Sequence, residues 1–190
     1  MGPPLEKEIE KRTKELMALR EELEGELQSK AMPHLDRAGI ALDKLEMRDM
    51  AELKSLAKPQ EQLKKVMATI AAVVYDLEVK TEADWRKKVG SYLVSDLQQF
   101  DRDEKLKEGS SQLKELERHC ADKELSLEEM ESFAGPRVAK LLNTWIWAMH
   151  EYAQVMKPIT PRIDKLHKME KELEKLYEEK KELDKSKPSS

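Results

Sequence analysis

Apolar residues near the start of the chain recur every three to four positions within an otherwise charged segment. From Leu5 to about Met32 they follow spacings of 4, 7, 3 and 4, and Arg12 occupies the skipped position. The apolar residues with this spacing are Leu5, Ile9, Leu16, Leu19 and Leu23. A narrow apolar stripe of this kind is typical of a coiled-coil helix. The segment therefore predicts a helix whose apolar seam needs a partner.

A second seam of the same kind lies near the end of the chain, from Ile159 to about Leu183. Lys180 occupies a position where a further apolar residue would fall. The residues that continue this seam are Ile163, Leu166, Leu173 and Leu176. A single helix with such a narrow stripe is only marginally stable in water. We therefore expect the two ends of the chain to pair as an antiparallel two-helix coiled coil.

The middle of the chain differs in composition from its ends. Residues 34–160 are richer in large apolar residues and contain all three tryptophans and both phenylalanines. Pro33 and Pro161 stand at the two junctions, and a proline removes a helical hydrogen bond and starts or kinks a helix. We expect a first coiled-coil arm over residues 1–33, a compact head over residues 34–160 and a second arm over residues 161–190.

Helical spacing and helix-end signals divide the first half of the head. Asp49 and Glu52 fit a capping box that opens a short helix, and the proline after Lys58 disfavours helical geometry at that residue. Turn residues at Thr81–Asp84 precede a helix that starts at Trp85. The helices expected before residue 101 are His34–Leu45, Asp49–Lys58, Leu63–Leu77 and Trp85–Phe100.

The second half of the head also predicts helices. Residues 101–105 form a polar break, after which a helix extends from about Leu106 or Ser110 to Cys120. Ser126 and Glu129 fit a capping box for a short helix. No segment alternates polar and apolar residues for the length of a strand, so the expected fold class is all-α: a small helical bundle on an antiparallel two-helix coiled coil.

The longest helix of the head opens at Gly135 and Pro136 and extends its apolar stripe to Met156. Trp145 lies on this stripe and is expected in the core. Trp147 lies about 200° further round the helix, because each residue adds about 100°. We therefore leave two readings of Trp147 open, packing on a neighbouring helix or exposure as an apolar contact at an interface.

Charge and composition narrow the possible classes of protein. The chain has 35 cationic and 39 anionic side chains, and its net charge of −4 argues against a uniformly basic nucleic-acid binder. Apolar residues make up 39% of the sequence, but no run approaches the roughly 20 residues of a membrane span, and the start lacks a signal-peptide core. The single cysteine, Cys120, cannot form an internal disulfide. We expect a monomeric cytosolic chain with neither nucleic-acid nor membrane partners.

Sequence motifs of catalysis and metal binding are missing from the chain. It contains no Gly-rich phosphate loop, GxSxG, HExxH or CxxC pattern. The four histidines are scattered, and the adjacent His119 and Cys120 point to different sides of a helix. We interpret this pair as a surface histidine beside a half-buried thiol. The chain is therefore expected to have no catalytic site and no metal site.

Four segments of the chain carry specific sequence motifs. They are Ala41–Pro59, the DW at Asp84 and Trp85, QQFDRD at residues 98–103, and Thr144–Leu166. The most specific motifs within them are AELKSLAKP and WxxAMxxY with the TPR that follows it at residues 160–162. Together these segments resemble the stalk head of dynein heavy chains, with a closer likeness to the axonemal subgroup of cilia and flagella. The order of arm, proline, helical head, proline and return arm is also that of the family.

The resemblance implies a microtubule-binding domain on the distal stalk of an ATP-driven motor. Its partner would be the microtubule (α/β-tubulin), in the cytoplasmic cytoskeleton and the axoneme. ATP and magnesium would belong to a motor ring outside this sequence, so no cofactor is expected here. In the family, nucleotide state reaches the head by sliding of one arm past the other, and Pro33 and Pro161 would act as the hinge between stalk and head. The interrupted seams agree with such sliding, because Arg12, Gly25 and Lys180 break the apolar pattern that would fix one register.

Six cations form the predicted contact set for tubulin. The resemblance places the first short helix and the last long helix of the head on the track. The outer surface of tubulin is acidic, so a binder needs clustered cations even when its total charge is negative. Lys54 and Lys58 are spaced as neighbours on one side of the short helix. The full set is Lys44, Arg48, Lys54, Lys58, Arg137 and Lys140.

Departures from the family pattern indicate weak, salt-sensitive binding. The family often places a cation one turn from Trp145, where this chain has Asn143 and Thr144, and Glu46 and Met47 stand where a transport dynein tends to carry lysines. Residues 34–160 hold 20 cations and 23 anions. Two alternatives remain open: an adaptor coiled-coil protein whose head binds another protein, and a nucleic-acid-binding helical arm. The second would need a basic stripe along the arms, whereas the arms are mixed in sign.

Overall fold

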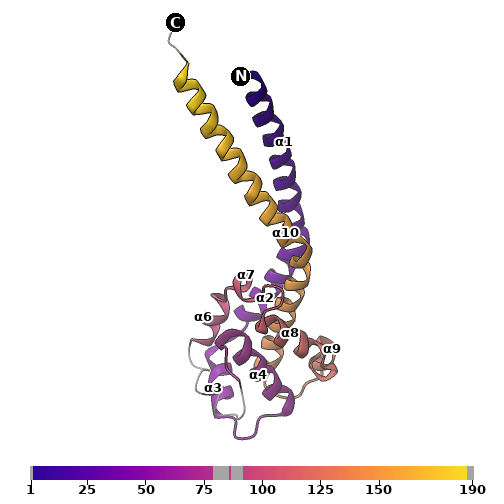
Figure 1. Cartoon of the computed structure of the whole chain (residues 1–190). Coiled ribbons are helices and arrows are strands. Elements are labelled where there is room, and N and C mark those ends of the chain that lie inside the picture. The colour runs from indigo at the N-terminus through magenta and orange to yellow at the C-terminus, as the bar shows by residue number, and fades with distance from the viewer. Residues whose placement is uncertain (1, 79–85, 87–91, 188–190) are drawn as a thin grey trace. The chain divides into compact units, whose positions relative to one another are not determined.

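The structure is a computed structural model that describes residues 2–78, 86 and 92–187 (Figure 1). Across these ranges the regular elements are all helical, with no strand, so the all-α class is confirmed for the described residues. The turn predicted at Thr81–Asp84 and the helix start at Trp85 lie outside the described residues. The chain divides into two compact units, one of Met1–Ala31 with Met156–Ser190 and the other of Met32–Val155.

The first unit consists of the two arms. Helix α1 (Gly2–Glu26) continues into a π-helix (Leu27–Ala31), and the returning arm is the end of α10 (Arg137–Ser186). The two seams predicted from the sequence supply the most buried positions. The buried apolar residues of this unit are Ile9, Leu16, Leu23, Ala31, Ile159 and Leu166. The other predicted seam residues are half-buried, which agrees with a two-helix contact that covers one narrow face of each helix.

Ion pairs between the arms define their antiparallel register. Residue numbers rise along α1 as those of their partners fall along α10, which requires antiparallel helices. The pairs are Glu6 with Lys180 at 4.0 Å, Arg12 with Glu172 at 3.1 Å, Arg20 with Glu170 at 3.0 Å, and Arg162 with both Glu22 at 2.8 Å and Glu26. The two cations that interrupt the seams, Arg12 and Lys180, therefore both reach a carboxylate on the opposite arm.

The prolines do not divide the helices as expected from the sequence. Helix α10 runs unbroken through Pro158 and Pro161, so no helix begins at Pro161. Both prolines are exposed, and water can satisfy the carbonyl groups that lose a helical partner. Pro33 is the second residue of α2 (Met32–Asp43), which follows directly on the π-helix. The helical backbone is continuous from residue 2 to residue 43, so Pro33 lies inside it and lacks the N–H that an interior helical residue donates.

The second unit packs short helices around the first part of α10. Its core includes Trp145, whose ring meets the edge of Phe100 with 5.5 Å between ring centroids. Trp145 is 2% exposed, so its predicted place in the core is confirmed. Besides α2 and α10, the described helices of this unit are α3 (Met47–Ser55), α4 (Glu61–Tyr75), α6 (Leu93–Gln98), α7 (Arg102–Lys105), α8 (Ser111–Ala121), the 3-10 helix η2 (Lys123–Leu125) and α9 (Leu127–Glu131).

Helix α3 begins two residues earlier and ends three residues earlier than predicted. Its N-cap is Glu46, and Asp49 is the third helical residue rather than the cap. The capping box therefore joins Glu46 to Asp49, whose carboxylate accepts the Glu46 backbone N–H at 2.8 Å. The helix ends at Ser55 because Leu56 adopts an extended conformation, so Lys58 lies beyond it.

Local capping chemistry explains the other helix starts. Ser126 accepts the backbone N–H of Glu129 at 3.0 Å, which confirms the predicted cap of α9. Ser110 caps α8 through the N–H of Leu113 at 3.1 Å. The polar break predicted at residues 101–105 is wrong. Asp101 accepts the N–H of Glu104 at 3.3 Å and caps α7, so residues 102–105 form a one-turn helix and not a loop.

Candidate functional site

The six predicted contact residues all belong to the Met32–Val155 unit. Lys44 follows the end of α2, Arg48 and Lys54 are on α3, and Lys58 is in the connection to α4. Arg137 and Lys140 are in the first turn of α10. Because Lys58 lies past the end of α3, the prediction that Lys54 and Lys58 are neighbours on one helix face is wrong.

Three of the six residues are free lysines. Lys44, Lys54 and Lys58 are exposed, and within the described ranges their ammonium groups have no carboxylate at ion-pair distance. The backbone near them is fixed, because the Arg86 side chain donates to the carbonyls of Lys54 and Leu56. These lysines therefore keep their charge available to a partner.

Arg137 is engaged within the head. Its Nε donates to Oδ1 of Asp49 at 3.0 Å, and a terminal nitrogen donates to the backbone carbonyl of Lys44. Asp49 is only 2% exposed, and its second oxygen accepts the Glu46 N–H. A buried carboxylate needs such partners, because an unpaired buried charge is costly. This contact joins the start of α10 to the residues between α2 and α3.

The remaining two cations also have partners in the head. Arg48 forms an ion pair with Glu46 at 2.6 Å, and both side chains are largely exposed. Lys140 donates to the backbone carbonyl of Glu131, the last residue of α9, at 3.0 Å. A cation at a helix C-terminus interacts favourably with the helix dipole. The structure thus brings Lys44, Asp49 and Arg137 together directly, while Lys140 is tied to α9.

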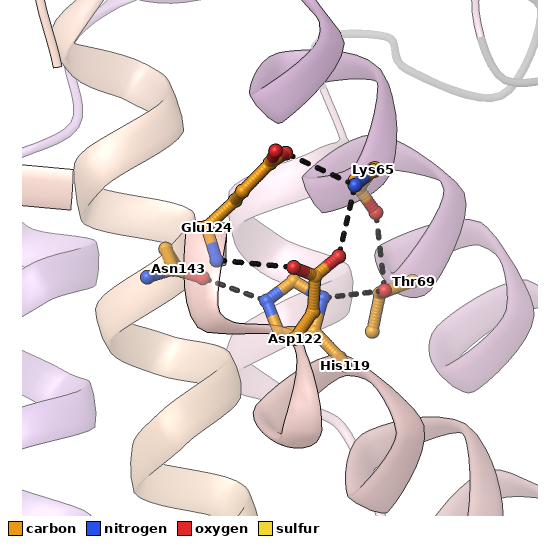
Figure 2. Close-up of polar contacts among 6 residues, drawn as sticks. All are labelled: Lys65, Thr69, His119, Asp122, Glu124 and Asn143. Carbon is orange, nitrogen blue, oxygen red and sulfur yellow. Dashed lines mark hydrogen bonds and ion pairs between the residues drawn. The ribbon is translucent and has the colours of Figure 1, made fainter. Parts of the chain in front are cut away.

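A buried polar network crosses the core beside these elements (Figure 2). Its centre is His119 on α8, which is 4% exposed, so the prediction of a surface histidine is wrong. Its Nδ1 lies 2.6 Å from Oγ1 of Thr69 on α4, and its Nε2 lies 2.7 Å from Oδ1 of Asn143 on α10. The ring therefore links three helices through hydrogen bonds.

The network continues from α10 to η2. Asn143 donates from Nδ2 to the carbonyl of Leu125 at 2.9 Å, and the indole N–H of Trp147 donates to the same oxygen at 2.8 Å. Trp147 is thus half-buried and packs on a neighbouring segment, the first of the two readings left open. A one-residue rotation of α10 would remove both donors from Leu125, so these bonds fix the orientation of the helix.

Charged residues lie at the outer edge of the network. Lys65 contacts Asp122 at 2.9 Å and Glu124 at 3.2 Å, as Figure 2 shows. The hydrogen bond to Asp122 raises the pKa of Lys65, and the same contact lowers the pKa of Asp122. Burial lowers the pKa of His119 and raises the pKa of the Cys120 thiol to about 12. The histidine therefore favours its neutral form, and the thiol is a poor nucleophile.

The network has the chemistry of a structural element. Both ring nitrogens of His119 bond to uncharged partners, so no carboxylate orients the ring as in a catalytic dyad. Among the residues that the structure describes, no group of three or more potential metal ligands gathers, and no helix is long and apolar enough to cross a membrane.

Sequence reasoning missed two features that organise this unit, the Asp49–Arg137 contact and the His119 network. The first leaves no local signal, because the two residues are 88 positions apart. The second has a weak signal: Thr69 and Asn143 are polar residues within strongly apolar stretches of α4 and α10. Polar residues at such positions need internal hydrogen-bond partners.

Protonation of His119 makes the stability of the head depend on pH. The folded pKa lies below the ordinary value of 6.5, so the unfolded chain takes up a proton first as the pH falls. We expect the free energy of unfolding to decrease as the pH falls below about 6.5, and His119→Gln to weaken this dependence. Urea unfolding followed by tryptophan fluorescence at several pH values measures it. The exposed His167→Gln is the control, and an unchanged pH dependence in His119→Gln would contradict the expectation.

A double-mutant cycle tests the contact between Asp49 and Arg137. Arg137→Gln leaves a buried carboxylate without its cation and is expected to lower the free energy of unfolding by about 1–3 kcal/mol. Adding Asp49→Asn should restore part of this loss, because the charge that needs a partner is then removed. Arg48→Gln, which loses only an exposed ion pair, should change stability by less than about 1 kcal/mol. Additive effects of the first two changes would show that the contact contributes little.

No protein-family model matches the chain. Comparison with curated proteins identifies dynein heavy chains as relatives. The chain is 31% identical over 137 residues, 72% of its length, to the dynein-1-beta heavy chain of the flagellar inner arm I1 complex of Chlamydomonas reinhardtii. It is 27% identical over 180 residues (87%) to the dynein gamma chain of the flagellar outer arm of the same organism, and 27% identical over 169 residues (86%) to human dynein axonemal heavy chain 10. These matches cover only 3%, 4% and 4% of the relatives. Over most of its length, the chain is therefore homologous to a short part of axonemal dynein heavy chains.

Proposed function

We propose that this chain is the microtubule-binding head and distal stalk of an axonemal dynein heavy chain. In this proposal the Met32–Val155 unit binds tubulin, and the unit of the two arms connects it to a motor ring elsewhere in the protein. The homology supports a dynein role. The antiparallel pairing of α1 with α10 and the surface chemistry around α3 support this particular part of the motor.

The observation that carries the proposal is the group of three free lysines around α3. Lys44, Lys54 and Lys58 are exposed and, among the described residues, lack a carboxylate partner. An acidic protein surface would therefore gain three ion pairs without first breaking internal ones. Many other surface cations of the head, such as Lys65 and Arg118, are paired with carboxylates of their own.

The other three predicted contact residues receive different roles. We propose that Arg137 positions the segment from Lys44 to Asp49 and does not act mainly as a contact. Lys140 stabilises the end of α9. Arg48 is exposed but shares its charge with Glu46, so its contribution to binding should be smaller than that of the free lysines.

The arms would transmit the state of the motor by a change of register, as the family resemblance implies. A shift of one helical turn, about 5.4 Å, would separate each observed cross-arm ion pair. These pairs are exposed or half-exposed, so breaking them costs little. Pro33 and Pro161 remain the proposed positions where such a shift reaches the head, and Pro158 adds a third proline to that segment.

Charge reversal at the free lysines tests the function. The variant with Lys54→Glu and Lys58→Glu should bind microtubules at least about tenfold more weakly in co-sedimentation, because two attractive contacts become repulsive. Lys114→Glu on α8 is the matched control, an exposed lysine outside the proposed surface, and should change affinity by less than about twofold.

The dependence of affinity on salt distinguishes electrostatic binding to microtubules from binding that does not rely on ion pairs. Exposed ion pairs are screened by added salt, so the affinity of the unmodified chain should fall as ionic strength rises. Micromolar or tighter binding that ignores salt would contradict an electrostatic surface. If the chain does not co-sediment with microtubules and tolerates Lys54→Glu in all its interactions, the adaptor alternative would be favoured.

A further inference from the structure

A small apolar pocket opens between α2, α6 and α10, within the Met32–Val155 unit. Its volume is about 170 Å³. Apolar side chains form most of its wall, among them Leu42, Leu97, Phe100, Trp145 and Met149. A cavity of about 150 Å³ with such a lining can hold a benzene molecule. The pocket therefore has the size of one leucine or phenylalanine side chain.

Arg102 contributes the charge at this pocket. It is the first residue of α7, and its guanidinium lies over the ring of Tyr152 at 5.3 Å from the centroid. Two aspartates flank it in sequence, but neither pairs with it. Asp101 caps α7, and Asp103 accepts the hydroxyl of Tyr152 at 2.6 Å. Within the described ranges no carboxylate lies at ion-pair distance from this arginine.

The Nε of Arg102 is buried and has no hydrogen-bond partner among the described residues. This atom is enclosed by the protein, so an outside acceptor would have to meet another nitrogen of the half-buried guanidinium. A carboxylate is the acceptor that best fits a guanidinium, through charge and through parallel hydrogen bonds. The pocket thus combines an apolar space of one side chain with a cation that has no carboxylate partner among the described residues.

We propose that this pocket binds an acidic peptide segment of a partner protein, with one apolar side chain in the cavity and a neighbouring carboxylate on Arg102. The volume favours a peptide over a free metabolite, since sites for small molecules usually measure about 300–1,000 Å³. A pocket for one side chain is instead typical of the anchor points of protein interfaces. This inference is independent of the three lysines around α3 and of their binding to tubulin.

Minimal ligands measure the two parts of this recognition separately. N-acetyl-phenylalanine carries the apolar side chain and the carboxylate, while its amide lacks the charge. We expect the acid to bind the full chain at about 1 mM, as suits so small a ligand, and the amide to bind at least about tenfold more weakly. The readout is the shift of the Trp145 indole signal in ¹H–¹⁵N NMR spectra.

Two variants locate the binding. Arg102→Gln should abolish the preference for the acid over the amide. Gly39→Leu should weaken the binding of both ligands, because Gly39 lines the pocket and the space around an added Cβ is open, so a leucine there fits beside the cavity and narrows it. Leucine also favours the helix more than glycine does, so the variant should fold.

Two control variants carry the same substitutions at positions away from the pocket. Gly25→Leu introduces the same residue in the first arm, where an added Cβ also meets nothing within 4 Å, and Arg118→Gln removes an exposed arginine on α8. Neither should change binding. Equal affinity for acid and amide, no shift of the Trp145 signal at about 10 mM ligand, or undiminished binding by Gly39→Leu would each overturn the proposal.

Discussion

The buried carboxylate of Asp49 is the contact on which the arrangement of the candidate site depends. One of its oxygens accepts the N–H of Glu46 and fixes the start of α3, while the other accepts Nε of Arg137 and fixes the start of α10. Because Arg137 also bonds to the carbonyl of Lys44, one charged group holds the end of α2, the start of α3 and the start of α10 together. The free lysines around α3 depend on this anchor for their positions.

Hydrogen bonds inside the core give α10 a defined orientation that apolar packing alone specifies poorly. Many rotations of a long helix bury a similar apolar area, but few allow Asn143 and Trp147 to donate to the same carbonyl of Leu125. His119 extends this restraint to α8 and, through Thr69, to α4. The polar contacts between the two arms differ from those of the core. They are exposed ion pairs, such as that of Arg12 with Glu172. A rigid head and arms with easily exchanged contacts suit the proposed transmission of a register shift.

The sequence predicted correctly those elements that depend on interactions between residues close together in the chain. The two seams, the apolar stripe through Trp145 and the Ser126 cap follow from spacing and short-range hydrogen bonds, and all occur in the structure. The predictions failed where contacts with residues far away in the sequence determine the position or the burial of a side chain. Asp49 resembles an N-cap in sequence, but Arg137 and Glu46 hold it as the third residue of α3. His119 resembles a surface residue because its partners, Thr69 and Asn143, are 50 and 24 positions away.

Cross-linking of the chain to microtubules by a carbodiimide, followed by mass spectrometry, tests the central claim most directly. This reagent activates a carboxyl group and joins it to an amine without a spacer, so it reports which lysines lie in direct contact with carboxylates of the partner. We predict cross-links to tubulin from Lys44, Lys54 and Lys58, with a yield that falls as salt is added. Cross-links confined to Lys114 and Lys123, which are exposed on other elements of the same unit, would contradict a binding surface around α3.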